Sequence, residues 1–190
     1  MSNNNNETQL PVMHLDFSNA LPANYTGIIC YAAGNKCWYL NGKLHRENDL
    51  PAAEYANGSK QWYLNGKLHR ENDLPAVEYA DGSKFWWLNG ERHRENDLPA
   101  IEYANGSKFW YLNGELHRET GPTIEYANGY KAWFLNGKEY SETDWKKEIF
   151  ALNKKTKSKW HTKEITKGTL GELSKIQEEL DEAHDALAQD

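Results

Sequence analysis

The chain has 190 residues, of which 38% are hydrophobic and 13% aromatic, and its formal net charge at pH 7 is −6. This acidic balance argues against a general nucleic-acid binder, because such proteins present an excess of basic side chains to the phosphates. The N-terminal residues lack the apolar core of a signal peptide, and no apolar run reaches the roughly 18 residues needed to span a membrane. We therefore expect a cytoplasmic protein that binds neither nucleic acid nor a membrane.

Residues 1–22 form a polar lead-in with few apolar side chains. The asparagine tract Asn3–Asn6 is typical of disorder, because such a segment buries too little apolar surface to offset the entropy of ordering. The sequence predicts that the lead-in is partly disordered.

A repeated phrase organises residues 23–140. It reads NGKLHRENDLPAAEYANGSKQWYL at 41–64, returns at 65–88 and 89–112, and is one residue shorter at 113–135. A degenerate copy, GIICYAAGNKCWYL, precedes them at 27–40. A regular period of 24 residues predicts a stack in which each unit contacts mainly its neighbours.

Two dipeptides recur at fixed places in the phrase, represented by Asn57-Gly58 and Asn65-Gly66. Asn-Gly tolerates positive φ at both central positions, which a type I′ hairpin turn requires. The runs between the dipeptides are rich in Tyr, Trp, Val, Ile and Phe, which favour strands. The sequence therefore predicts a mainly β protein: a single-layer antiparallel β-meander of about five repeated hairpins.

The turns also predict a register. If Asn57 and Gly58 are the whole loop, residue 54 lies opposite 61 and residue 53 opposite 62; through the second turn, 63 lies opposite 68. This register places Tyr55 and Trp62 on one face, which we expect to be the core, and the ring at position 63 on the other. The segment Arg70–Leu74 is too polar for a strand and predicts a bulge or short loop at one edge of the sheet.

The segment WYLNGKLHRENDLPAAEYANG resembles the MORN repeat family: a ring, Asn-Gly, Lys, His and then an aromatic strand ending in a second Asn-Gly. The glycine that usually follows the histidine is replaced by Arg70 and its equivalents. The resemblance covers roughly residues 27–140. It implies an elongated single-layer sheet that serves as a scaffold, a protein-binding surface or a lipid head-group binder, and it specifies no activity.

Three segments follow the repeats. Residues 141–153 predict a short amphipathic helix that begins at Ser141 and caps the open end of the sheet. Residues 154–168 are lysine-rich and predict a linker. Residues 169–190 predict an amphipathic helix whose apolar residues recur at a/d spacing, which makes a homodimer through this seam one alternative. The seam consists of Leu173, Ile176, Leu180, Ala183 and Leu187.

The last segment also resembles the first helix of MazG-like nucleotide pyrophosphohydrolases, through the run Lys175–Glu182. The resemblance implies Mg²⁺ ligands at Glu179 and Glu182, whereas the family's later Glu-x-x-Asp helix is absent from the chain. Together, the two resemblances suit a bacteriophage protein and leave open whether the natural chain extends past Asp190. No cofactor or metal is expected outside this alternative.

Several recurring side chains are candidates for a site. The histidines are expected to stack on neighbouring tryptophans, because equivalent positions about 9–10 Å apart cannot share one metal ion; these are His45, His69, His93 and His117. Cys30 and Cys37 are expected to face each other across the first hairpin as two thiols. Aromatic and arginine side chains are enriched at protein interfaces. The predicted partner-binding set is therefore the aromatic stripe Tyr39, Tyr63, Trp87, Tyr111 and Phe134 with the arginine edge Arg46, Arg70, Arg94 and Arg118.

The sequence thus predicts a non-enzymatic protein-binding repeat protein. A phage origin would make a host defence protein the expected partner, to be modulated or blocked. Two alternatives stay open: a Mg²⁺-dependent nucleoside triphosphate pyrophosphohydrolase, or a relic of one, and a scaffold that self-assembles through its C-terminal helix.

Overall fold

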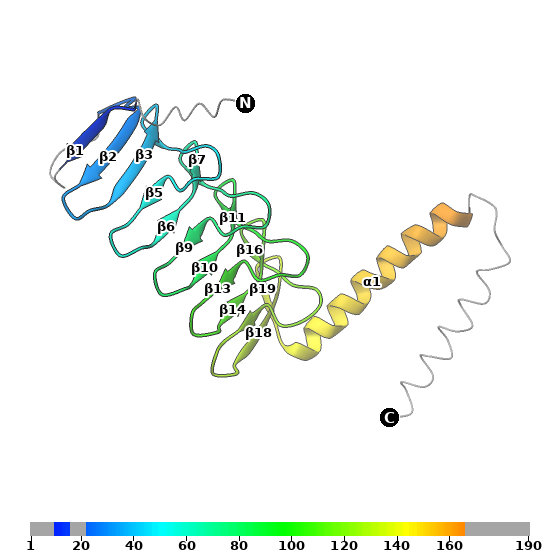
Figure 1. Cartoon of the computed structure of the whole chain (residues 1–190). Coiled ribbons are helices and arrows are strands. Elements are labelled where there is room, and N and C mark those ends of the chain that lie inside the picture. The colour runs from blue at the N-terminus through cyan, green and yellow to red at the C-terminus, as the bar shows by residue number, and fades with distance from the viewer. Residues whose placement is uncertain (1–9, 16–21, 166–190) are drawn as a thin grey trace, which may run out of the picture. The chain divides into compact units, whose positions relative to one another are not determined.

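The computed structural model describes residues 10–15 and 22–165, with side chains as far as residue 155. The chain divides into two compact units after Trp145. The first unit contains a sheet of 13 strands in hairpin-like order, which confirms the mainly β fold class (Figure 1). The order along the sheet is β1-β2-β3-β5-β6-β9-β10-β13-β14-β17-β18-β19, with β4 paired to β3.

The strands at both ends of the array are longer than those in its middle. The bounds are β1 Val12–Leu15, β2 Gly27–Tyr31, β3 Lys36–Leu40, β4 Lys43–Leu44, β5 Ala53–Glu54, β6 Lys60–Gln61, β7 Tyr63–Leu64, β8 Lys67–Leu68, β9 Val77–Glu78, β10 Lys84–Phe85, β11 Trp87–Leu88, β12 Glu91–Arg92, β13 Ile101–Glu102, β14 Lys108–Phe109, β15 Tyr111–Leu112, β16 Glu115–Leu116, β17 Ile124–Glu125, β18 Lys131–Leu135 and β19 Lys138–Tyr140.

Strand β1 lies inside the segment that the sequence assigned to a polar lead-in. It pairs with β2 in parallel, with Val12 opposite Ile28 and Leu15 opposite Tyr31. The sheet is therefore mixed, whereas the sequence predicted an antiparallel meander throughout.

The run 59–64, which lies between the two Asn-Gly dipeptides and was expected to form a strand, is divided at Trp62. Its N–H donates to Ala76 O, next to β9 of the main sheet, whereas its carbonyl accepts from His69 N, next to β8. The residues before Trp62 consequently belong to the main sheet. The residues after it form a small hairpin with β8, and β11–β12 and β15–β16 repeat this arrangement.

The second turn of each copy has the predicted geometry. Asn65 (φ 53°) and Gly66 (φ 83°) both adopt positive φ, and Tyr63 lies opposite Leu68 as expected. A type I′ turn matches the twist of the strands that it joins, which is why Asn-Gly sets this register locally.

The first turn has a different geometry, and the predicted register there is wrong by one residue. Gly58 (φ 91°) has positive φ but Asn57 does not, and Gly58 N donates to Tyr55 O. The loop thus has three residues, a type I turn followed by a glycine bulge. Glu54 lies opposite Lys60 and Ala53 opposite Gln61.

This one-residue shift exchanges the faces of the first strand. Val77, Phe85 and Ile101 form a buried cluster on one face, with Leu68, Trp87, Phe109 and Tyr111 packed against it. The aromatic stripe of the prediction therefore lies on the same face as the core. Tyrosines and phenylalanines continue along this face in edge-to-face contacts from Tyr79 to Tyr126, with ring centroids 5.1–5.6 Å apart.

The opposite face carries a row of alternating charges. Each lysine of the row lies between two glutamates of neighbouring strands, as Lys60 does between Glu54 and Glu78. Opposite charges directly across a sheet stabilise the pairing. Past this row the buried Trp62 and its equivalents lie on the same face, by the alternation of side chains along a strand.

The helix α1 (Glu142–Ile165) begins where the sequence predicted. Ser141 Oγ accepts from Asp144 N at 3.1 Å, which is an N-cap. In the first unit, Trp145 is buried and donates from Nε1 to Arg118 O, so the first turn of the helix covers the last copy. The helix continues through 154–165, which the sequence assigned to a linker.

Candidate functional site

The polar segments that follow the histidines lie along one side of the array, which we call the loop edge: Arg46–Leu50, Arg70–Leu74 and Arg94–Leu98. Each is a tight turn. Asn72 and Asp73 both have positive φ, at 59° and 55°, and Leu74 N donates to Glu71 O. Asn and Asp tolerate this left-handed conformation better than other non-glycine residues. The same pair of positive φ values recurs at Asn48-Asp49 and Asn96-Asp97.

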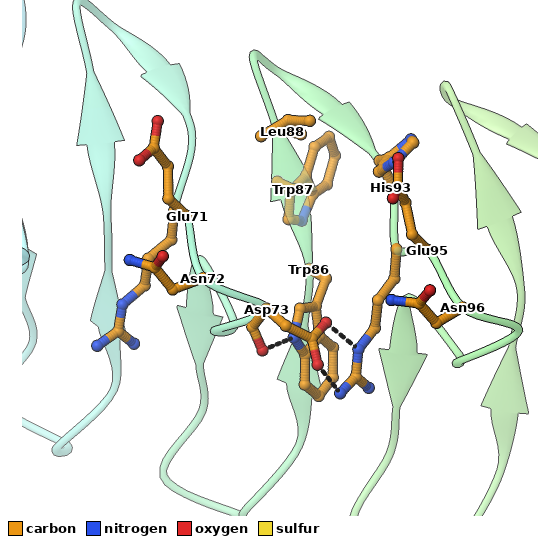
Figure 2. A pocket seen from close by; sticks show the side chains of 11 residues that line it. Glu71, Asn72, Asp73, Trp86, Trp87, Leu88, His93, Glu95 and Asn96 are labelled. Carbon is orange, nitrogen blue, oxygen red and sulfur yellow. Dashed lines mark hydrogen bonds and ion pairs between the residues drawn. The ribbon is translucent and has the colours of Figure 1, made fainter.

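An arginine of the next copy holds each turn in place. Nε and Nη2 of Arg94 donate to the two carboxylate oxygens of Asp73 at 2.7 and 2.9 Å (Figure 2). Nη1 donates to Pro99 O and Glu102 Oε1, and the guanidinium stacks on the Trp86 ring at 3.7 Å. Arg70 and Arg118 make the equivalent contacts at the neighbouring junctions between copies.

The hydrogen bonds from Arg94, with its charge, hold the pKa of Asp73 below its usual range against the opposing effect of burial. Arg70 lowers the pKa of Asp49 in the same way, and Arg118 lowers that of Asp97. These carboxylates are therefore ionised at neutral pH and neutralise the arginines.

The indole of Trp86 completes the junction. Its Nε1 donates to the Asp73 carbonyl at 2.9 Å, so that Asp73 accepts bonds from the tryptophan of its own copy and from the arginine of the following copy (Figure 2). Trp62 and Trp110 donate to Asp49 and Asp97 in the same manner. Successive copies are thus joined rigidly at the loop edge.

Three grooves of similar lining lie between successive turns. The central groove has a volume of about 250 Å³. Glu71 and Asn72 line it from one turn, Glu95 and Asn96 from the next, and Trp87 and Leu88 lie between them (Figure 2). The flanking grooves, of about 480 and 200 Å³, have the equivalent linings.

The lining of each groove is acidic. The central groove has two cations, Arg70 and Arg94, and three carboxylates, those of Glu71, Asp73 and Glu95. The glutamates extend into solvent, with 75% of the Glu71 side chain and 74% of the Glu95 side chain exposed. Because the arginines are already bonded to carboxylates of the array, the excess negative charge at the groove is that of Glu71 and Glu95, whose Oε1 atoms lie 3.7 and 3.6 Å from Nε2 of His69 and His93.

The histidines couple neighbouring copies by hydrogen bonds. His69 Nδ1 accepts from Asn89 N at 3.1 Å, and His45, His93 and His117 accept in the same way from the asparagine of the next type I′ turn. The guanidinium of an arginine stacks on each of these tryptophan rings. The expected histidine–tryptophan stack stays a prediction.

The predicted arginine edge and aromatic stripe both take part in intramolecular contacts. Side chains of Arg70 and Arg94 are only 12% and 11% exposed. Arg46 stacks on Trp38 and bonds to Glu54, and Arg118 is held by Asp97. Each stripe residue is half-buried: Tyr39, Tyr63, Trp87, Tyr111 and Phe134.

Arg92 links two rings of the stripe. Its guanidinium lies 5.1 Å from the Trp87 ring and 5.3 Å from the Tyr111 ring, and Nη1 approaches the Tyr111 hydroxyl at 3.4 Å. The sequence prediction gave this arginine no role, because its equivalents in neighbouring copies are leucines.

The two cysteines do not face each other as predicted. Cys30 lies opposite Lys36, and Cys37 lies opposite Ile29, because the first hairpin has the same three-residue turn as the others. Both are free thiols, and burial raises the pKa of Cys37 to about 11. A thiol with this pKa is protonated at neutral pH and is a poor nucleophile.

The remaining predicted site residues lie outside the described residues. These are the seam residues Leu173, Ile176, Leu180, Ala183 and Leu187 and the Mg²⁺ candidates Glu179 and Glu182. Within 10–15 and 22–165, no helix combines the length and apolarity needed to cross a membrane.

The grooves themselves were not among the predicted sites. The sequence identified the polar turns as an edge feature, and their recurrence was visible, but Glu71 and Glu95 belong to different copies and come together only in the stack. No protein-family model matches the chain, and no match was found among curated proteins.

Proposed function

We propose that the protein is a non-enzymatic binding protein that holds a protein partner along its loop edge. The observation that supports this proposal is the recurrence of one groove, with the same residue types, at three successive junctions of the array. A row of like grooves offers a partner several equivalent contacts, which add up in one binding event.

The contents of the grooves favour a protein ligand. Trp87 and Leu88 supply apolar surface between polar turns, which is the composition of a protein–protein contact with an apolar centre and a polar rim. The bonded junctions between copies also favour binding, because a surface that is ordered before binding loses less conformational entropy when the partner binds.

The proposal moves the binding surface away from the predicted aromatic stripe. Trp87 contributes to both, since its ring packs against the core cluster and also lines the central groove. Tyr63 and Tyr111 line the two flanking grooves in the same way, whereas Tyr39 and Phe134 line none of the three. A host defence protein stays the sequence-based prediction for the partner's identity.

A pair of matched leucine variants tests the proposal. Leu64 and Leu88 line two of the grooves and are 38% and 37% exposed, whereas Leu74 and Leu98 are 37% and 38% exposed and line none of the three. We expect proteins captured from the native host by the wild-type chain to be lost with Leu64→Gln/Leu88→Gln and retained with Leu74→Gln/Leu98→Gln. Equal capture by the two variants, or no capture by the wild type, would contradict the proposal.

A further inference from the structure

The charges that line the grooves of the loop edge indicate the charge of the ligand that fits them. Each is lined by two arginines and three carboxylates, so an acidic excess recurs at every junction. Arg70, Arg94 and Arg118 are held by Asp49, Asp73 and Asp97, and Arg46 bonds to Glu54, so these arginines are not free to meet a carboxylate or phosphate from outside. A cationic ligand therefore complements the grooves, and an anionic one does not.

The apolar part of the lining favours a lysine or arginine side chain over a bare metal ion as the cation. Leu88 lies between the turns that carry Glu71 and Glu95, with 37% of its surface exposed. A lysine or arginine has an apolar stem that can lie along such a leucine while its charged end reaches a carboxylate. A bare metal ion would gain nothing from the leucine and the tryptophan.

The spacing of the grooves sets the conformation of the ligand. Successive grooves are related by one repeat, which is two strands of the main sheet or about 9.4–9.8 Å. A polyproline II chain has three residues per turn and rises about 9.3 Å in one turn, so every third side chain points the same way. A β-strand alternates its side chains with period two and cannot direct every third one to the same side.

We propose that the loop edge binds an extended basic segment of a partner protein in the polyproline II conformation, with a lysine or arginine at every third residue. One basic side chain enters each groove, its stem lies against Leu64, Leu88 or Leu112, and its charge meets the glutamates of the two flanking turns. This inference rests on the proposed binding function and specifies the ligand.

Peptide binding to the full chain tests the spacing. The probe is a labelled peptide of four Lys-Pro-Pro triplets, and its control has the same composition with the lysines placed together at one end. We expect the periodic peptide to bind more tightly by on the order of tenfold, because only it can occupy three grooves at once. Equal affinity of the two peptides would overturn the periodicity argument, as would tighter binding of a Glu-Pro-Pro peptide.

Two charge-reversal variants test the location. Glu71→Lys/Glu95→Lys changes the exposed carboxylates of the central groove, whereas Glu91→Lys/Glu115→Lys changes the net charge equally on exposed residues that line none of the three grooves. The control substitutions are structurally matched, because Lys43 and Lys67 occupy the same place in the first two copies.

We expect the groove variant to lose about tenfold or more in affinity for the periodic peptide, since two exposed ion pairs are replaced by repulsion. The control should stay close to the wild type in moderate salt. Equal loss in both variants would mean attraction to net charge alone and would overturn the inference.

The outcomes separate this inference from the function on which it rests. If the leucine variants identify a partner at the loop edge but the periodic peptide does not bind, the binding function stands and the basic-segment ligand is rejected. If neither the partner nor the peptide depends on the grooves, both proposals are rejected.

Discussion

Asp73 and Arg94 belong to successive copies of the repeat, and the two side chains form a fork of two hydrogen bonds at 2.7 and 2.9 Å. The arginine is 11% exposed and stacks on Trp86, whose indole donates to the carbonyl of the same aspartate. Asp73 is thus bonded to Trp86 of its own copy and to Arg94 of the next, and Arg94 in turn stacks on Trp86. This junction both joins the copies and forms one wall of each groove.

Arg94→Lys should destabilise the array while keeping its charge. An ammonium cannot form the planar fork or stack on the indole, so we expect a loss of about 1–2 kcal/mol in the free energy of unfolding, measured by urea denaturation. A double-mutant cycle with Asp73→Asn isolates the fork, and its coupling energy should be about 1 kcal/mol, because the carboxylate is half exposed and screened by solvent. Purely additive effects of the two substitutions would contradict a direct contribution of the fork.

The stability of the protein should fall in acid because of the three junction aspartates. Their pKa values are lowered in the folded state, chiefly by hydrogen bonds from Arg70, Arg94 and Arg118. Their contribution is therefore fully present above the ordinary aspartate pKa of about 3.9 and is lost as the pH falls through the lowered folded values.

Urea midpoints at pH 5 and pH 3 measure this dependence. The triple variant Asp49→Asn/Asp73→Asn/Asp97→Asn should be less stable than the wild type at pH 5 and should show a smaller drop between the two pH values. An unchanged drop would assign the acid sensitivity to other carboxylates.

Gln61→Phe should stabilise the protein. Phe85 and Phe109 occupy the equivalent positions and make edge-to-face contacts with tyrosines of both neighbouring strands, whereas Gln61 accepts from the hydroxyls of Tyr55 and Tyr63. A phenylalanine would extend the aromatic series, and the hydroxyl groups of the two half-buried tyrosines can turn to water. We expect a gain of about 1 kcal/mol in the free energy of unfolding. A loss of stability would show that the two hydroxyl bonds matter more than ring packing.

Trp145→Ala should loosen the last copy of the array. The side chain is 7% exposed and its Nε1 donates to Arg118 O, and truncation of a buried tryptophan costs about 3–5 kcal/mol. Amide exchange should accelerate first in β17, β18 and β19, because an uncapped end frays. Phe150→Ala is the matched control on the same helix: its side chain is 64% exposed, and β17 to β19 should keep their protection. Equal acceleration in both variants would contradict a capping role for Trp145.

Local signals predicted several features well. Asn65 and Gly66 were expected in a type I′ turn and have positive φ at both positions. Ser141 was expected to start a helix, and its hydroxyl accepts from Asp144 N. Each of these features depends on a few consecutive residues, so the sequence window that encodes it is short.

Features that depend on neighbouring copies were predicted poorly. The predicted site included Arg70 because arginine is common at interfaces. In the structure its guanidinium donates to Asp49 and stacks on Trp62, so it is already used within the molecule. Glu71 was not among the predicted site residues and turns out to be three-quarters exposed at a groove. Which polar side chain is satisfied inside the molecule depends on the register between copies, and no single copy contains that information.

The sequence by itself determined that the chain is mainly β, where its tight turns lie and where its helix starts, because these depend on the backbone preferences of adjacent residues. Only the tertiary structure decided which side chains share a face of the sheet. The dipeptide Asn57-Gly58 is compatible with a two-residue or a three-residue loop. In the structure the loop has three residues and begins at Ala56, whose N–H donates to Asn35 of the preceding copy. Side chains alternate along a strand, so one extra loop residue changes which side chains share a face. Ala53 and Val77 consequently lie on the same face as Gln61 and Phe85. Trp62 and Trp86 lie on the other face, where arginines stack on their rings.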